Sequence, residues 1–173
     1  MSPVIHGTFA VERDLDAPPP QVFQAFADPQ IRTRWFRMPG TQEDARHDMD
    51  FRVGGYERAS GIFAPMGTEV TERLSYNSTF MDIATDERLV FTYDVSLDGI
   101  RRWTSLVTIE LAALSKNDGK SDGDGTRLTR TEQYAYLTYA ADGQQDIAHL
   151  KGSATLHLNA LAAALTKLRQ TQE

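Results

Sequence analysis

The stretch RDLDAPPPQVFQAFADP, residues 13–29, followed six residues later by Trp35 and Phe36, decides the fold of this 173-residue chain. An alternating strand ends at Ala17. Three consecutive prolines then start a helix, because the first turn of a helix needs no backbone N–H donor. Asp28 is placed to cap a second short helix that ends near Trp35. The stretch therefore predicts a strand followed by two short helices.

Composition and charge exclude several classes of protein. The chain is 40% hydrophobic and 24% charged, as in ordinary globular proteins, and its length suits one domain over residues 1–173. Its net charge of −6, without a basic block, argues against nucleic acid or an anionic membrane as partner. With no cysteines, disulfides and thiolate catalysis are excluded. The apolar runs are shorter than the roughly 20 residues that span a bilayer, and no signal-peptide pattern is present. We expect a cytoplasmic protein.

The rest of the chain predicts an antiparallel sheet followed by one long helix, an α+β fold. Short turns such as Asp98–Gly99 connect the segments that alternate in hydrophobicity. From Gln144, apolar residues recur every three or four positions, which predicts an amphipathic helix of about 25 residues against the concave face of the sheet. After residues 7–15, strands are predicted over residues 48–53, 56–63, 69–84, 88–95, 103–111 and 127–137.

Two details of the long helix follow from single residues. Asp142 and Gln145, three positions apart, resemble a capping box. Gly152 lies inside the helix, where glycine costs roughly 1 kcal/mol relative to alanine, so we expect it to mark a kink or a close backbone contact.

Four segments resemble one family in order along the chain: residues 13–36, FRVGG at 51–55, DERLVFTY at 86–93 and GTRLTRTEQ at 125–133. They resemble the START-like superfamily (also called SRPBCC, Bet v 1-like or helix-grip), and within it the activator of heat-shock protein 90 ATPase homologue-like family. The resemblance implies a curved sheet of six or seven strands wrapped around a long C-terminal helix, with a cavity between them. Members that stimulate heat-shock protein 90 usually carry a further N-terminal domain, for which this chain has no room.

The last strand carries the strongest candidates for a ligand site. Arg130, Glu132 and Tyr134 are candidates because they share a face with Leu128, so they point into the cavity if Leu128 does. The resemblance implies an apolar residue at the position of Arg130. An inward arginine can bind a carboxylate or polarise a carbonyl, and Glu132 can pair with it or act as a base. The alternative is a structural ion pair, or a solvated face at the edge of the sheet.

Three large rings are the other candidates for the site. Trp35, Tyr93 and Trp103 lie near predicted element ends, where they can line a cavity mouth and stack on a ligand. Ordinary core positions are the alternative for all three.

No metal or cofactor is expected. The four histidines, His6, His47, His149 and His157, form no zinc-binding spacing. We interpret them as surface or satisfied core residues.

Three functions remain open at this point. The first is a domain without catalysis that binds a small hydrophobic or amphipathic molecule between the sheet and the C-terminal helix. The second is a polyketide-cyclase-like enzyme that uses Arg130, Glu132 and a tyrosine as acid–base groups. The third is an activator of the heat-shock protein 90 ATPase. The sequence also leaves a homodimer open.

Overall fold

The computed structural model describes residues 3–40, 44–64, 69–114 and 124–171. Within these residues one antiparallel sheet of seven strands has the order β1-β7-β6-β5-β4-β3-β2. This arrangement confirms the predicted α+β fold. The elements in chain order are β1 (Ile5–Leu15), α1 (Pro19–Ala27), α2 (Pro29–Trp35), β2 (Arg46–Met49), β3 (Tyr56–Phe63), β4 (Glu72–Ala84), β5 (Arg88–Leu97), β6 (Ile100–Ala113), β7 (Thr126–Tyr136) and α3 (Gln144–Gln170).

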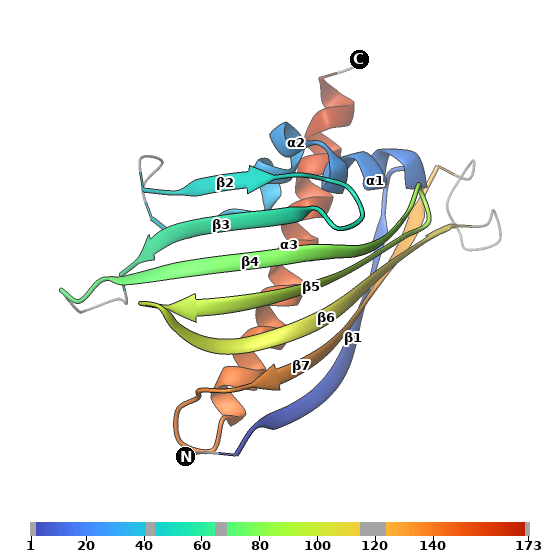
Figure 1. The fold of residues 1–173 in the computed structure, drawn as a ribbon. Helices are drawn as coiled ribbons and strands as arrows, with labels where there is room; N and C mark the ends of the chain where they lie inside the picture. The colour runs from blue at the N-terminus through green and yellow to red at the C-terminus, as the bar shows by residue number, and fades with distance from the viewer. Residues whose placement is uncertain (1–2, 41–43, 65–68, 115–123, 172–173) are drawn as a thin grey trace.

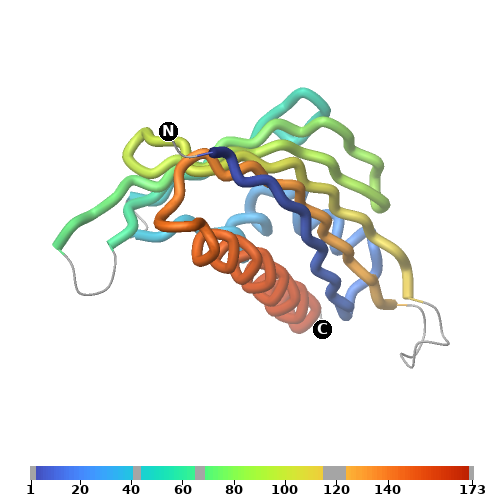
Figure 2. Tube along the Cα trace, turned by 90° about the horizontal axis from the view of Figure 1, so that it is seen from below, coloured from blue at the N-terminus to red at the C-terminus, as the bar shows by residue number. Residues whose placement is uncertain are grey.

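The sheet curves over α3, which crosses its concave face (Figures 1 and 2). Helices α1 and α2 lie beside the C-terminal part of α3 (Figure 1). The strand register shifts between Phe80 and Asp82 in β4 and between Val95 and Ser96 in β5. Such β-bulges bend a strand and increase its twist, which helps the sheet to wrap around the helix.

The connection between α1 and α2 follows the pattern of its residues. Asp28 ends α1 and caps α2, where its Oδ1 accepts a hydrogen bond from the backbone N–H of Gln30 (2.8 Å). The indole N–H of Trp35 donates back to the carbonyl of Ala25 (2.9 Å). The cap at Asp28 forms as the sequence predicts, and the bond from Trp35 ties the end of α2 to the C-terminal part of α1.

The core lies between the inner face of the sheet and α3. Strand residues alternate between buried and more exposed positions, and the buried set faces the helix. The predicted apolar stripe of α3 is buried, with Leu158, Leu161 and Leu165 at most 3% exposed. No helix among the described residues combines the length and the apolar character that crossing a membrane requires.

Two expectations are wrong: the end of the strand predicted over residues 48–53, and the capping box of α3. Strand β2 ends at Met49 instead of Val53, because the chain turns there to pair with β3, and Gly54 takes a left-handed conformation with φ +77°. The capping box does not form either. The N-cap of α3 is Gly143, also left-handed, and Asp142 accepts a hydrogen bond from the N–H of Gln144 instead.

Among the residues that the structure describes, the expected close contact at Gly152 is also absent. A Cβ atom built on this residue meets no heavy atom within 4 Å, and the residue is exposed on α3. Its backbone needs no positive φ. The glycine is therefore not required by space or backbone geometry at this position.

Leu161→Ala should reduce the free energy of unfolding by roughly 2–5 kcal/mol, because it removes a fully buried leucine and leaves a cavity. Urea denaturation measures this value. Leu156→Ala is the matched control on the same helix, since Leu156 is 68% exposed, and it should change stability little. Equal effects of the two changes would mean that the buried face of α3 is assigned wrongly.

Gly152→Ala should raise the free energy of unfolding by roughly 0.5–1 kcal/mol, because alanine restricts the unfolded chain and favours the helix. Thermal or urea denaturation can detect the gain. A loss of stability would contradict the open space around Gly152.

Candidate ligand-binding site

A cavity of about 230 Å³ lies between the inner face of the sheet, helix α2 with the loop that follows it, and the middle of α3. Most of its wall is apolar or aromatic, and the loop residues Arg37 and Met38 and the α3 residue Ser153 lie at its more exposed side. The lining residues are Phe26, Arg32, Trp35, Phe36, Arg37, Met38, Pro39, Leu74, Tyr76, Phe91, Tyr93, Val95, Trp103, Ile109, Arg130, Leu150, Ser153, Ala154, His157 and Leu158.

One wall of the cavity carries a hydrogen-bonded chain across β5, β6 and β7. Arg130 donates to Oε2 of Glu132 from Nη2 (2.7 Å) and Nε (3.2 Å). The other oxygen of Glu132 accepts from the hydroxyl of Tyr93, whose own oxygen accepts from the indole N–H of Trp103 (3.2 Å). Glu132 is fully buried, so an oxygen without a hydrogen bond would be costly, and both of its oxygens accept one.

A second ion pair joins α2 to β3. Arg32 donates from Nε and Nη2 to the two oxygens of Glu57 (2.7 and 2.9 Å), and His47 Nε2 lies 2.8 Å from Glu57 Oε1. The guanidinium of Arg32 also stacks on the rings of Phe36 and Trp35, at 4.1 and 4.3 Å from their centroids. Both arginines face the cavity, and strands β4 to β6 separate the strands that hold their glutamates.

Burial and these charges set the ionisation of the site. Burial alone would raise the pKa of Glu57, but Arg32 and the hydrogen bond from His47 lower it to about 2. Burial lowers the pKa of Arg130, yet the neighbouring Glu132 carboxylate outweighs burial and raises it. Burial and Glu132 together raise the pKa of Tyr93. At neutral pH Glu57 is therefore ionised, and Arg130 and Tyr93 are protonated.

His157 projects from α3 into the same cavity, with its ring 5.4 Å from that of Phe36. Burial, then the charges of Arg130 and Arg32, lower its pKa to about 4. Its imidazole is therefore neutral at physiological pH.

The structure brings most of the predicted site residues together. Arg130, Tyr93, Trp103 and Trp35 line the cavity, and Glu132 lies behind Arg130 as its partner. The indole N–H of Trp35 is already bonded to Ala25, so this residue offers only its ring.

Tyr134 does not reach the cavity. It lies two residues beyond Glu132 on β7, in a separate cluster with Tyr136, Ile147 and Leu150 under the first turns of α3. Its hydroxyl lies over Gly7 of the neighbouring strand β1, where a Cβ atom would be only 2.2 Å away.

Sequence reasoning missed His157, Arg32 and Glu57. His157 follows Ala154 by three positions and precedes Leu158, so the apolar stripe of α3 already placed it near the core. Glu57 shares a strand face with Ala59, which should have marked it as inward. Arg32 had no comparable signal, because α2 is too short for a clear period.

His157 should titrate with a midpoint near pH 4 in the folded protein, as measured by NMR of its ring protons and assigned with His157→Gln. Because this pKa lies below the ordinary value of 6.5, the unfolded chain binds the proton more tightly. The contribution of His157 to stability is therefore present above pH 6.5 and is lost as the pH falls to about 4. His157→Gln should remove that part of the pH dependence, and a midpoint near 6.5 would show that the ring is solvated.

Comparison with known proteins agrees with the fold. A protein from Rhizobium leguminosarum has a solved structure that superimposes with a TM-score of 0.75 at 28% identity, over 95% of this chain and 97% of the other. A crystal structure of a protein from Rhizobium loti is 37% identical, with a TM-score of 0.71 over 94% of this chain and 99% of the other. No curated protein matches the chain. The family model described as activator of Hsp90 ATPase homolog 1-like protein matches residues 16–166, so the chain belongs to this family.

Proposed function

We propose that the protein binds a small hydrophobic or amphipathic molecule in the cavity between the sheet and α3. The observation that carries the proposal is the cavity itself, with mostly apolar and aromatic walls and a few polar groups that converge on it. This combination is typical of sites for small ligands. The fold of the family, which commonly encloses such ligands, supports the same function.

Binding is better supported than acid–base catalysis by Glu132. A general base needs a free oxygen within reach of the substrate, but one oxygen of Glu132 accepts from Arg130 and the other from Tyr93. The raised pKa of Tyr93 also keeps its hydroxyl protonated. These contacts suit a rigid wall more than a group that exchanges protons.

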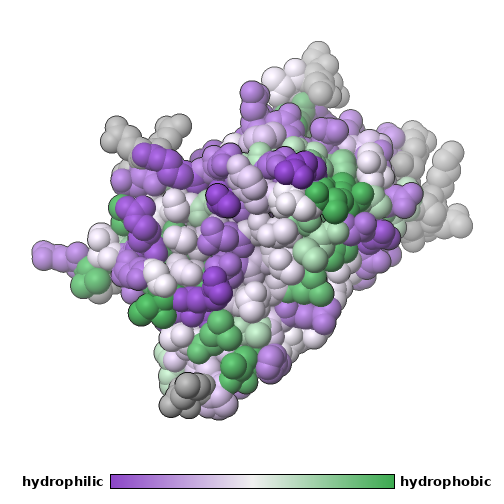
Figure 3. All heavy atoms as spheres, in the orientation of Figure 1, coloured by the Kyte–Doolittle hydropathy of each residue, from purple (hydrophilic) through white to green (hydrophobic). Residues whose placement is uncertain are grey.

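The outer face of the sheet gives less support to a role as an activator of a chaperone ATPase. In Figure 3 the hydrophobic residues of this face stand in separate groups among hydrophilic ones. A docking surface for a protein partner is usually a larger continuous apolar patch. The cavity is therefore the feature around which the proposed function is built.

Intrinsic fluorescence can test the proposal directly, because the chain has two tryptophans, Trp35 and Trp103, and both line the cavity. A series of alkylbenzene derivatives that do not absorb at the tryptophan excitation wavelength serves as probes. Binding should change the emission in a saturable way.

Ser153→Phe should weaken this binding at least tenfold, because Ser153 lies on the exposed side of the cavity and a ring there blocks it. Ser153→Ala is the matched control and should leave binding unchanged. If no probe binds, or if Ser153→Phe binds as well as the unchanged protein, the proposed function is wrong.

A further inference from the structure

We infer that the cavity selects a ligand with an apolar body and one anionic oxygen head group, such as an aryl or alkyl carboxylate, which Arg130 binds. The inference rests on the proposed function and adds the chemical class of the ligand. Three observations carry it: the charges that line the cavity, the donors that its arginines leave free, and the carboxylates held behind them.

The lining carries only one sign of charge. Arg32, Arg37 and Arg130 face the cavity, and its described lining contains no aspartate or glutamate. This is opposite to the chain as a whole, in which 24 acidic residues outnumber 18 basic ones. The lining of the cavity is therefore positively charged, although the chain as a whole is negatively charged.

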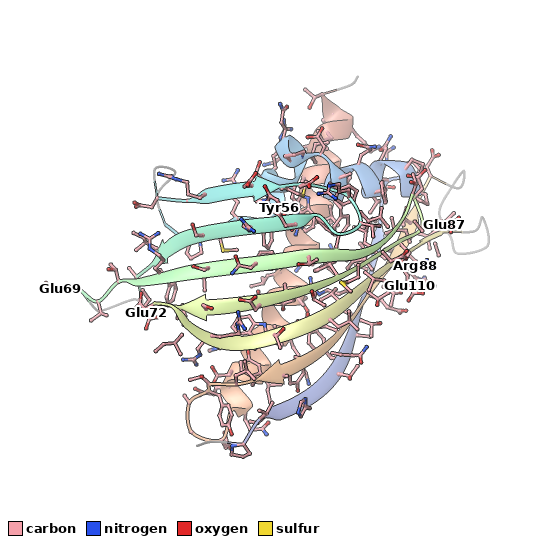
Figure 4. All side chains as sticks on the ribbon, viewed as in Figure 1. Tyr56, Glu69, Glu72, Glu87, Arg88 and Glu110 are labelled. Carbon is pink, nitrogen blue, oxygen red and sulfur yellow. The ribbon has the colours of Figure 1, made fainter. Side chains whose placement is uncertain are left out.

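Acidic side chains lie at both ends of the sheet instead. Figure 4 places Glu69 and Glu72 at one end of the sheet and Glu87 and Glu110 at the other. A buried cationic wall in a protein with an acidic exterior favours an anion in that one place, because charges interact more strongly where water is excluded.

Both arginines of the ion pairs, buried Arg32 and part-buried Arg130, have donors that bind no protein group. Each uses Nε and Nη2 to bind its glutamate. Within the described residues the Nη1 groups of Arg32 and Arg130 make no hydrogen bond. Neither atom is among the fully buried atoms without a partner, so both remain accessible to solvent. A guanidinium carries five N–H donors, so these groups can bind a further oxygen anion.

The two carboxylates lie on the far side of their arginines from the ligand. Glu57 and Glu132 are buried, 2% and 0% exposed, and neither lines the cavity. Each pair thus presents its positive end to the cavity and its negative end to the sheet. A neutral carbonyl would accept from the same donors, but hydrogen bonds to an ionised acceptor are roughly twice as strong.

The test compares phenylbutanoate with phenylbutanamide, which have the same apolar body and differ in the charge of the head group. At neutral pH the tryptophan emission should report binding of the acid at least tenfold tighter than that of the amide, since a hydrogen bond to a charged group contributes about 1.5–3 kcal/mol. Acid binding should also raise the pKa of His157, which feels Arg130, Arg32 and Glu57, because an anion beside the ring favours its protonated form.

Two variants of the Arg130–Glu132 pair should change the affinity for the acid in opposite directions. Glu132→Gln keeps Arg130 but removes the charge that neutralises it, so phenylbutanoate should bind severalfold tighter. The double variant Arg130→Met/Glu132→Gln removes both charges without leaving a buried carboxylate unpaired, and should bind the acid at least tenfold more weakly while amide binding changes little. Urea denaturation confirms that each variant is folded.

Arg88→Met is the control for net charge. Arg88 pairs with Asp82 and is exposed at the start of β5 (Figure 4), so its loss should leave both affinities unchanged. Equal affinity for acid and amide, or tighter binding of the amide, overturns the inference and leaves the proposed function standing. Weaker acid binding in both Glu132→Gln and the double variant also overturns the inference, since that outcome means that the substitutions distort the cavity. If neither probe binds, both the inference and the proposed function are wrong.

Discussion

The width of one helix is the constraint on which this structure depends. Seven strands about 4.8 Å apart span roughly 29 Å, whereas a helix with its side chains is about 10–12 Å wide. Helix α3 alone cannot cover the concave face of the sheet. It packs on the side of β1, while α2 contacts both β2 and α3. The space between the helices and the middle of the sheet is filled only in part, and the remainder is the cavity.

The side chains that fill the space between α3 and the sheet explain where the cavity lies along α3. In the C-terminal half of α3, Leu161 and Leu165 are buried in the same hydrophobic cluster as the apolar residues of α1 and do not line the cavity. Toward the middle of the helix, Ala154 and Ser153 are small, and the opposite wall is built from rings. Ala154 and Ser153 leave room on the helix side of the cavity, between the larger Leu150, His157 and Leu158.

Two ion pairs beside one cavity, both with buried glutamates, carry a cost that packing alone does not require. Removing a charge from water costs several kcal/mol per ion, and apolar residues of similar volume are often as stable as a buried pair. Arg32 and Glu57 reduce this cost with a two-point contact, and Glu132 does so with Arg130 and Tyr93. Their position beside the cavity is consistent with a role in recognition.

The sequence alone determined the order of the elements and the faces of the strands. The prolines before Gln21, the cap at Asp28 and the change of period at Gln144 act locally, so they are readable without neighbours. The same alternation put Arg130 and Glu132 on the inner face. The tertiary structure decided what these residues meet. Glu57 and His157 lie far apart in the chain, and only the curvature of the sheet around α3 sets both beside one cavity. It also excluded Tyr134, because the N-terminal turns of α3 cover that part of β7.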